Sequence, residues 1–283
     1  MSIVESKPGT VLNRIVEARR AEVARRKRIM PEAMLRIAAG KADPPRDFAR
    51  ALSRNQLNVI AEIKKASPSA GVLRQQFEPV ALAQSFEQAG AAALSVLTEE
   101  ENFQGALAHL RDARKGVALP ALRKDFIMDP WQVWEARAAS ADSFLLIAAA
   151  LDDVSLTALL HLGRELGMEA LVEAHTGEEV ERALAAGARI IGVNNRNLHT
   201  LEVRVETSFE LIEAIPDGHI AVSESGLRSA EDLRKLRAAG FDAFLIGESL
   251  MRETDPGAAL RRLIGPSSDR AADSAAESSD RSR

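Results

Sequence analysis

The sequence predicts an α/β fold built around a parallel sheet, and three observations lead to this expectation. Short apolar runs recur along most of the chain, and stretches of helical periodicity separate them. The repeat is roughly 25–30 residues long, which suits a strand–helix unit. Several helical stretches end in Ala-Gly directly before the next run, where glycine caps helices. Eight such units predict a (β/α)8 TIM barrel.

The apolar runs are the expected strands of this barrel. They cover 58–65, 92–98, 118–124, 143–149, 169–175, 189–195, 219–225 and 242–248. The predicted helices cover 79–89, 106–115, 131–139, 156–166, 178–186, 208–215, 230–239 and 256–264. A doubly wound open sheet is the alternative. The number of units, and the lack of a GxGxxG motif after any run, favour the barrel.

The segment before the first strand predicts a helical extension. Thr10 is a suitable N-cap for a helix that reaches Met30. A second helix starts at Pro31 and is expected to end at Gly40. A Pro-rich linker and a short helical turn over 48–52 follow. The basic run over 25–28 is interpreted as a solvated helix face, with an anion-binding patch as the alternative.

The end of the chain has a different composition. From residue 266 onward it contains almost no large apolar side chains, so it cannot bury a core and is expected to be a disordered tail. The predicted organisation is therefore an N-terminal helical extension over 1–56, a catalytic barrel over 57–265 and a tail over 266–283.

The overall composition excludes several classes of protein. A net charge of −4 and 4% aromatic residues speak against a nucleic-acid partner. The absence of cysteine excludes disulfides and a thiolate nucleophile, and it suits a reducing cytoplasm. Five histidines without metal-binding spacing predict no metal. No run is long and apolar enough for a membrane span, so we expect a cytoplasmic protein without membrane contact.

The first predicted strand carries a charged pair. Within NVIAEIKKASPSAG (58–71), Glu62 and Lys64 lie two residues apart and therefore share one face of a strand. Val59, Ala61 and Ile63 form the apolar opposite face. Buried charges are costly unless they are paired or used. A half-exposed strand with a solvated Glu–Lys face is the alternative interpretation.

Other strands end in polar residues that share a face with apolar ones. Lys124 follows Leu122 at this spacing, and Glu173 follows Leu171. Asn194 follows Gly192 at the same spacing, and Glu224 follows Val222. Active sites of such barrels lie at the C-terminal ends of the strands, so these groups are expected to converge on one mouth and suit acid–base chemistry. Taken singly, each side chain fits a rim salt bridge equally well.

The last two strands end in small residues. Glycines at positions 226 and 247 come next to helix starts, where barrels commonly bind phosphate through backbone N–H groups. We expect a phosphate site there, with tight turns as the alternative.

These residues carry a resemblance to the indole-3-glycerol phosphate synthase family of tryptophan biosynthesis. The matching stretches are AEIKKASPSAG (61–71), SVLTEEENFQG (95–105), LRKDFIMDPWQVWEAR (122–137), LVEAH (171–175), IGVNNRNLHTLEV (191–203), SESGL (223–227) and FLIGESLMR (244–252). The resemblance extends from about residue 10 to 264. Ala70 departs from it, since a basic residue is common there, and this weakens the expected local attraction for an anion.

The resemblance implies a cofactor-free, decarboxylating ring closure. The substrate would be 1-(2-carboxyphenylamino)-1-deoxyribulose 5-phosphate, and the products indole-3-glycerol phosphate, CO2 and water. Lys124 would be the general acid at the ribulose carbonyl. Glu173 would be the base or proton shuttle, helped by Glu62. Lys64 would hold the substrate carboxylate or act as a second acid, and Asn194 would complete the catalytic group.

The remaining implied residues bind the substrate. They are Arg196 and Glu224 as orienting groups, Ser67, Ser225, Gly226, Gly247 and the backbone of Glu248 for the phosphate, and Phe103 and Phe126 for the anthranilate ring. Core packing is an equal alternative for the two phenylalanines.

Three other functions compete with this expectation. Phosphoribosylanthranilate isomerase would use a Cys–Asp pair, and this chain has no cysteine. A non-catalytic barrel that binds a phosphorylated ligand would show no turnover. A nucleic-acid-binding protein would act through the Arg-rich first helix with salt-sensitive affinity. We expect a small phosphorylated substrate as the partner, and a monomer or weak homodimer.

Overall fold

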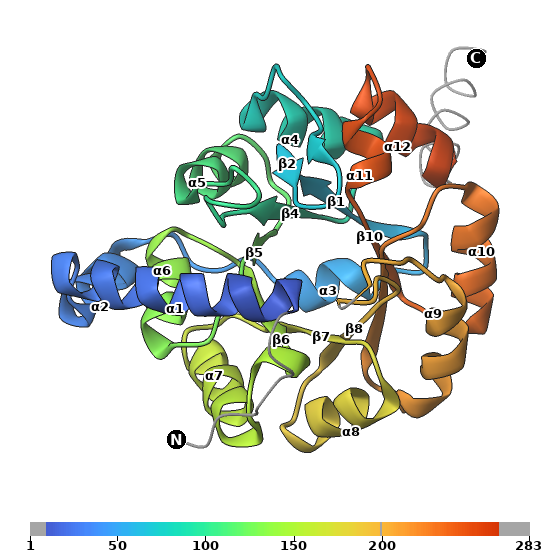
Figure 1. The fold of residues 1–283 in the computed structure, drawn as a ribbon. Coiled ribbons are helices and arrows are strands. Elements are labelled where there is room, and N and C mark those ends of the chain that lie inside the picture. The colour runs from blue at the N-terminus through green and yellow to red at the C-terminus, as the bar shows by residue number, and fades with distance from the viewer. Residues whose placement is uncertain (1–9, 199, 266–283) are drawn as a thin grey trace, which may run out of the picture.

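The computed structural model describes residues 10–198 and 200–265, which form a closed parallel barrel with helices around it (Figure 1). The barrel order is β1-β10-β9-β8-β7-β6-β5-β4. Its strands are β1 (Asn58–Ile63), β4 (Ala93–Leu97), β5 (Ala121–Lys124), β6 (Ser143–Ile147), β7 (Leu171–Ala174), β8 (Ile190–Asn194), β9 (Ile220–Glu224) and β10 (Ala243–Ile246). Pairing of β1 with β10 closes the ring, so the barrel prediction is confirmed and the open sheet is wrong.

The outer helices follow the strands as the sequence predicts. They are α4 (Pro79–Ala89), α5 (Leu107–Lys115), α6 (Pro130–Ala138), α7 (Asp153–Glu165), α8 (Gly177–Ala185), α9 (Glu206–Leu211), α10 (Ala230–Ala239) and α12 (Pro256–Ile264). Short 3-10 turns, η1 (Ala148–Ala150) and η2 (Ile212–Ala214), follow β6 and α9. Gly90 and Gly240 end α4 and α10 in the left-handed conformation that favours glycine.

Three short elements in the loops after β1 and β10 were not predicted. A hairpin of β2 (Ala66–Ser67) and β3 (Gly71–Val72) forms in the loop after β1, and α11 (Glu248–Met251) follows β10. Several predicted boundaries differ by a few residues: β5 begins at Ala121 and α7 at Asp153, and α2 (Glu32–Lys41) continues through Gly40. Gly40 does not have the positive φ by which Gly90 and Gly240 end their helices, so the helix runs on to Lys41. The predicted tail over 266–283 lies outside the described residues.

The pleat of the strands separates two apolar layers. Inward residues such as Ile60, Leu122 and Val222 form one buried cluster, and outward residues such as Val59 and Phe144 pack against the helices. Phe48 and Leu52 of α3 (Phe48–Leu52) join the interior cluster. The short helix therefore closes the N-terminal end of the barrel.

Strand register brings the polar strand ends to one level. Glu173 lies beside Ile147 on one side and beside Gly192 on the other, and Asn194 lies beside Glu224. Because C-terminal ends of parallel strands meet at one rim, these side chains converge on the mouth of the barrel.

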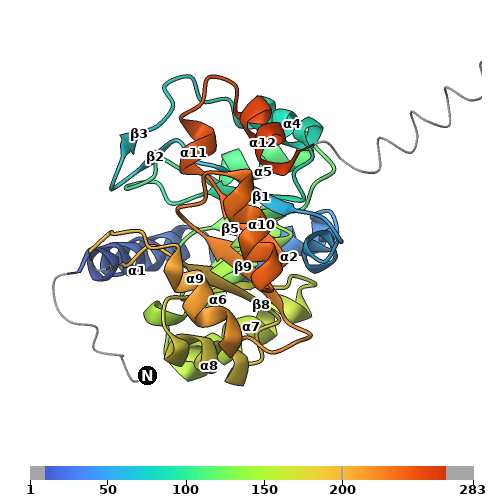
Figure 2. The same cartoon turned by 90° about the vertical axis from the view of Figure 1, so that its right-hand side faces the viewer.

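Helix α1 (Val11–Ile29) packs at this mouth. In Figure 2 it lies on the same side of the barrel as the β2–β3 hairpin. Arg19 is buried on its inner face, and its guanidinium lies 2.6 Å from the carboxylate of Asp125, directly after β5. The basic run is only partly solvated, because Arg26 pairs with Glu135 and Lys27 lies 2.9 Å from Asp129.

None of the helices within residues 10–198 and 200–265 has the length and hydropathy needed to cross a bilayer.

Candidate active site

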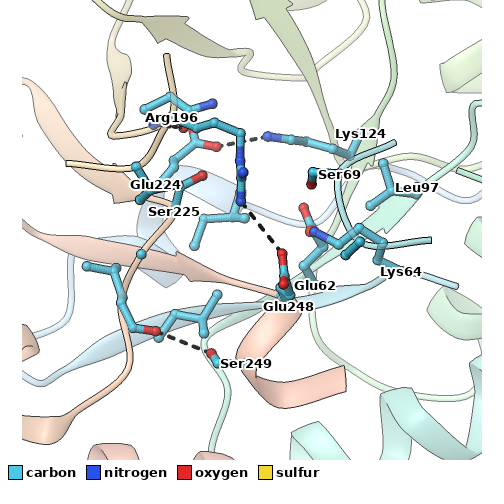
Figure 3. A pocket seen from close by; sticks show the side chains of 18 of the residues that line it. Glu62, Lys64, Ser69, Leu97, Lys124, Arg196, Glu224, Ser225, Glu248 and Ser249 are labelled. Atoms are coloured by element: carbon cyan, nitrogen blue, oxygen red, sulfur yellow. Dashed lines mark hydrogen bonds and ion pairs between the residues drawn. The ribbon is translucent and has the colours of Figure 1, made fainter. Parts of the chain in front are cut away.

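A cavity of about 780 Å³ opens at the C-terminal mouth of the barrel (Figure 3). Its charged and polar lining includes Glu62, Lys64, Ser69, Lys124, Asp125, Glu173, Asn194, Arg196, Glu224, Ser225, Arg228, Glu248, Ser249, Arg252 and Glu253. Its apolar lining includes Leu97, Phe103, Phe126, Leu145, Ile147, Leu198, Val203, Leu227, Leu245 and Ile246. The site can therefore hold a ligand that is both apolar and anionic.

Lys124 lies between two carboxylates. Its Nζ is 2.8 Å from Oε2 of Glu224 and 3.0 Å from Oε2 of Glu173. Burial opposes the charge of the lysine, but Glu173, Glu224 and Glu62 outweigh it and raise the pKa of Lys124 well above its usual range. The lysine is therefore an ammonium at neutral pH, with its proton available to an acceptor that replaces one of the carboxylates.

The two glutamates differ in their protonation. Burial acts against the charge of Glu173, but Lys124 and His175 hold the pKa of Glu173 well below its usual range. Burial raises the pKa of Glu224 to about 7; the charge of Glu173 acts in the same direction, and Lys124 acts against it. One carboxylate is thus held ionised while the other exchanges its proton near neutral pH. Such a split suits a site with separate base and acid roles.

Glu224 occupies space that a side chain on β8 would fill. A Cβ at Gly192 would lie 2.2 Å from Oε1 of Glu224, so any other residue there would displace this carboxylate. This same Oε1 has no hydrogen-bond partner among the described residues. A buried acceptor of this kind is available to a ligand.

The charged pair of the first strand forms as predicted. Nζ of Lys64 lies 2.6 Å from Oε1 of Glu62. Burial opposes the charge of Glu62, but Lys64 and Lys124 outweigh it and lower the pKa of Glu62. A Cβ at Gly247 would lie 2.3 Å from this Oε1, so Gly247 makes room for the carboxylate of Glu62.

Arg196 reaches across the mouth. Its backbone N–H donates to Oδ1 of Asn194 at 3.0 Å, which fixes the start of the loop after β8. Its guanidinium donates to the carbonyl of Leu201 at 3.1 Å and lies 3.6 Å from Oε2 of Glu248 (Figure 3). Within the described part of the chain, the one charged partner of Arg196 is thus the carboxylate of Glu248, which a substrate anion can replace.

The turns after β9 and β10 form the side of the cavity where phosphate was expected. Ser225 and Gly226 have φ of 69° and 82°, so the chain turns sharply and exposes backbone after β9. After β10, Gly247 precedes the short helix α11. Both turns line the cavity, together with Arg228 and Ser249.

The expected aromatic residues also line the cavity, and one expected serine does not. The rings of Phe103 and Phe126 lie 6.3 Å apart, centre to centre. Ser67, the second residue of β2 in the hairpin, is buried and does not line the cavity, whereas Ser69 does. The Oγ atoms of these serines are 3.5 Å apart.

Several lining residues were missed by sequence reasoning. Leu145 and Ile147 have the inward parity of β6, so the alternation of that strand contained the signal for them. Arg228 and Arg252 lie beyond the strand ends, and their positions depend on how the loops fold. No cluster of three or more metal-ligating side chains occurs within the ranges that the structure describes.

Comparison with known proteins gives a consistent result. Residues 12–263 match the family model described as indole-3-glycerol phosphate synthase. The chain is 49% identical over 258 residues to the indole-3-glycerol phosphate synthase of Chromobacterium violaceum, covering 90% of this chain and 97% of that protein. It is 49% identical over 267 residues to that of a Roseiflexus species, covering 91% and 99%.

A solved structure supports the fold alone. The 3-hexulose-6-phosphate synthase of Salmonella typhimurium is 12% identical, with a TM-score of 0.59 over 74% of this chain and 97% of that chain.

Proposed function

We infer the roles of the site residues from one premise: the chain belongs to the indole-3-glycerol phosphate synthase family. Its activity is that of this carboxy-lyase of tryptophan biosynthesis, which acts on a phosphorylated substrate. The reaction closes the indole ring of 1-(2-carboxyphenylamino)-1-deoxyribulose 5-phosphate and releases CO2 and water. The residue roles below are our proposals.

Lys124 is proposed as the general acid of ring closure. The aryl carbon that bears the carboxylate attacks the ribulose carbonyl, and negative charge develops on the carbonyl oxygen. An ammonium at this point stabilises that charge and can protonate the alkoxide as it forms. The position of Nζ between Glu173 and Glu224 carries the proposal, because a carbonyl oxygen that displaces one carboxylate meets an oriented N–H donor.

Glu173 is proposed as the base that removes the ring-adjacent proton after loss of CO2. Its carboxylate is ionised at neutral pH, and it contacts Lys124, so proton transfer within the pair needs little movement. Glu62 supports it from the first strand. Glu224, with a pKa of about 7, would orient the substrate and exchange a proton with it.

Lys64 is proposed to hold the substrate carboxylate and to serve as a second acid when water leaves. Its ammonium is 2.6 Å from Glu62 and lines the cavity. Asn194 and Arg196 would hold the chain of hydroxyl groups, since Asn194 ends β8, Arg196 follows it, and both line the cavity.

The phosphate and the aromatic ring of the substrate are proposed to bind at different walls of the cavity, one built from backbone turns and the other from apolar side chains. The phosphate would bind at the turns after β9 and β10, through the backbone around Ser225, Gly226, Gly247 and Glu248, with Ser67 only indirectly through Ser69. The anthranilate ring would lie against Phe103 and Phe126 and their apolar neighbours.

Turnover by the purified protein tests these roles. Indole fluorescence should rise when substrate is added, and Lys124→Met or Glu173→Gln should abolish most of that rise. Comparable rates in both variants and the wild type would contradict the assignment.

Three wider proposals accompany the residue roles. The extension over 1–56, the catalytic barrel over 57–265 and the tail over 266–283 are proposed as the functional divisions, supported by the position of α1 and α3 against the barrel. A monomer or weak homodimer is proposed, and sedimentation analysis would test it. A cytoplasmic location remains a prediction from the cysteine-free composition.

A further inference from the structure

His175 contacts the proposed base from outside the cavity. It follows β7, two residues after Glu173, on the same face of the chain. Oε1 of Glu173 lies 3.4 Å from Nε2 of His175, whereas Oε2 lies 3.0 Å from Nζ of Lys124. Each oxygen of the carboxylate thus has its own nitrogen neighbour. Unlike Lys124, His175 is not among the described residues that line the cavity.

A second carboxylate fixes the imidazole. Oε2 of Glu179, in the first turn of α8, lies 3.2 Å from Nδ1 of His175. The same oxygen accepts the backbone N–H of His175 at 2.8 Å. The backbone N–H of Glu179 in turn donates to the Thr176 hydroxyl at 3.2 Å. The ring orientation is therefore set by the start of a helix and not by the ligand.

The resulting row of groups alternates in charge: Lys124, Glu173, His175, Glu179. Burial acts against a charged imidazole, but the two glutamates outweigh it and raise the pKa of His175 to about 9. His175 is thus an imidazolium at neutral pH. Its side chain is only 12% exposed, so its interaction with Glu173 is weakly screened by solvent.

This second cation matters because the first one has another task. Lys124 must turn to the carbonyl oxygen of the substrate, which loosens its hold on Glu173. Glu62 and Glu224 also face Glu173, and their charge favours its protonation. Without another cation, Glu173 would take up a proton before the step in which a base is needed.

We propose that His175, fixed by Glu179, is a positioning residue whose charge, 3.4 Å from Glu173, keeps that carboxylate ionised while Lys124 serves the substrate. This inference rests on the proposed role of Glu173 as the base. His175 touches no reacting atom and acts through the carboxylate beside it.

The pH dependence of kcat in His175→Gln tests the inference. A base must be ionised, so the rate falls as pH drops through its pKa. Removing a cation at this distance raises the pKa of a carboxylate by about one unit or more. The acid limb of the kcat profile should therefore move toward neutral pH by about one unit, while KM above pH 8 stays near the wild-type value. An acid limb that coincides with that of the wild type overturns the inference.

His161→Gln is the matched control. His161 forms the same i,i+4 contact with a glutamate, Glu165, at 3.3 Å, but on the exposed surface of α7. Its replacement should leave the pH profile unchanged. A shift equal to that of His175→Gln would show a general effect of histidine loss and would overturn the inference.

Two further measurements test the inference even if His175→Gln does not fold. An NMR titration of the wild-type His175 ring should show it protonated through neutral pH, with a midpoint near 9. A midpoint near 6.5, the ordinary value, overturns the inference. In Glu179→Gln the midpoint should fall and the acid limb of kcat should move in the same direction as in His175→Gln.

Glu173→Gln separates this inference from the proposal on which it rests. Near-normal turnover in Glu173→Gln removes Glu173 from the mechanism, and the role of His175 with it. An inactive Glu173→Gln together with an unshifted His175→Gln profile leaves Glu173 as the base and rejects His175 alone.

Discussion

Gly192 and Glu224 fit together only because Gly192 has no side chain: a Cβ on this residue of β8 would lie 2.2 Å from Oε1 of Glu224 on β9. Glu224 is 1% exposed and its other oxygen contacts Lys124, so it cannot move aside without disturbing the lysine. The glycine is therefore part of how the active site is built.

Gly192→Ala should lower kcat strongly, because the methyl group displaces Glu224 and with it the orientation of Lys124. Overpacking of this kind typically destabilises a protein by about 1–3 kcal/mol. Steady-state kinetics and chemical denaturation measure the two effects. Gly40→Ala is the control: a Cβ there meets nothing within 4 Å in α2, so activity should be unchanged and stability equal or slightly higher.

Lys124→Met should lower kcat by at least about a hundredfold, since it removes a general acid and the charge at the developing oxyanion. KM should change less, because this interaction forms mainly in the transition state. Lys124→Arg should not restore the rate, since guanidinium does not give up its proton. Near-normal turnover in Lys124→Met would transfer the acid role to Lys64.

The stability of Lys124→Met should fall at neutral pH. The ammonium is flanked by Glu173 and Glu224, and its loss leaves Glu173 with His175 alone and Glu224 with no ionic partner among the described residues. The decrease in stability should be smaller in acid, where those carboxylates are protonated. Lys235→Met removes an exposed lysine paired with Glu231 and should change neither kcat nor melting temperature appreciably.

Glu224 should make the folded protein more stable as the pH falls from 8 to 5. Its pKa rises from 4.5 to about 7 on folding, so the native state binds this proton more tightly than the unfolded chain does. The gain in unfolding free energy is on the order of 3 kcal/mol. It is complete near the pKa of Glu224 in the unfolded chain, and it is lost as the pH rises through the pKa of Glu224 in the folded protein. Glu62, Glu173 and Asp125 act in the opposite direction, because their pKa values are lowered.

A comparison with Glu224→Gln isolates this contribution. The difference in unfolding free energy between the wild type and the variant should shift in favour of the wild type between pH 8 and pH 5. A difference that is constant over this range would show that Glu224 titrates alike in both states.

Gly226→Ala should raise KM more than it lowers kcat. The residue has φ of 82° and its Cβ would lie 2.6 Å from Cγ1 of Val203, so the turn proposed for the phosphate must shift. Inhibition by inorganic phosphate should weaken in parallel with substrate binding. Gly218→Ala is matched for backbone strain, with φ of 90° and no neighbour within 4 Å, and should leave KM unchanged.

Arg19→Met should destabilise the protein by about 3 kcal/mol or more, because it breaks a buried ion pair with Asp125. Denaturant titration measures the loss. Arg262→Met breaks an exposed pair with Glu253 and should change the unfolding free energy by less than about 1 kcal/mol. Equal effects of the two substitutions would show that burial of Arg19 contributes nothing.

The barrel itself could be predicted because its signals are local. Each strand is a short apolar run bounded by helical periodicity, and parity put Lys124, Glu173 and Glu224 on the same strand faces as residues that the structure places inside the barrel. The Gly40 boundary was wrong because a glycine can continue a helix when nothing terminates it.

Relationships between distant segments were beyond sequence reasoning. Arg19 and Asp125 are 106 residues apart, and nothing near either one indicates the other. An inward lysine considered alone is expected to weaken the fold, whereas the structure surrounds Lys124 with carboxylates that reverse the expectation. The space that Gly192 leaves for Glu224 depends on the register of two strands, which parity does not determine.

Closure of the barrel by β1 and β10 has a consequence for how the chain acquires its structure during synthesis. The side-chain amide of Asn58 donates to the backbone carbonyl of Leu52. It also donates to the backbone carbonyl of Asp242, which lies 184 residues later in the chain. Contacts so remote in sequence form late, because a long loop must be closed before they stabilise anything. A nascent chain therefore carries β1 as an open edge until β10 leaves the ribosome, and this interval is when strand-to-strand aggregation threatens it most.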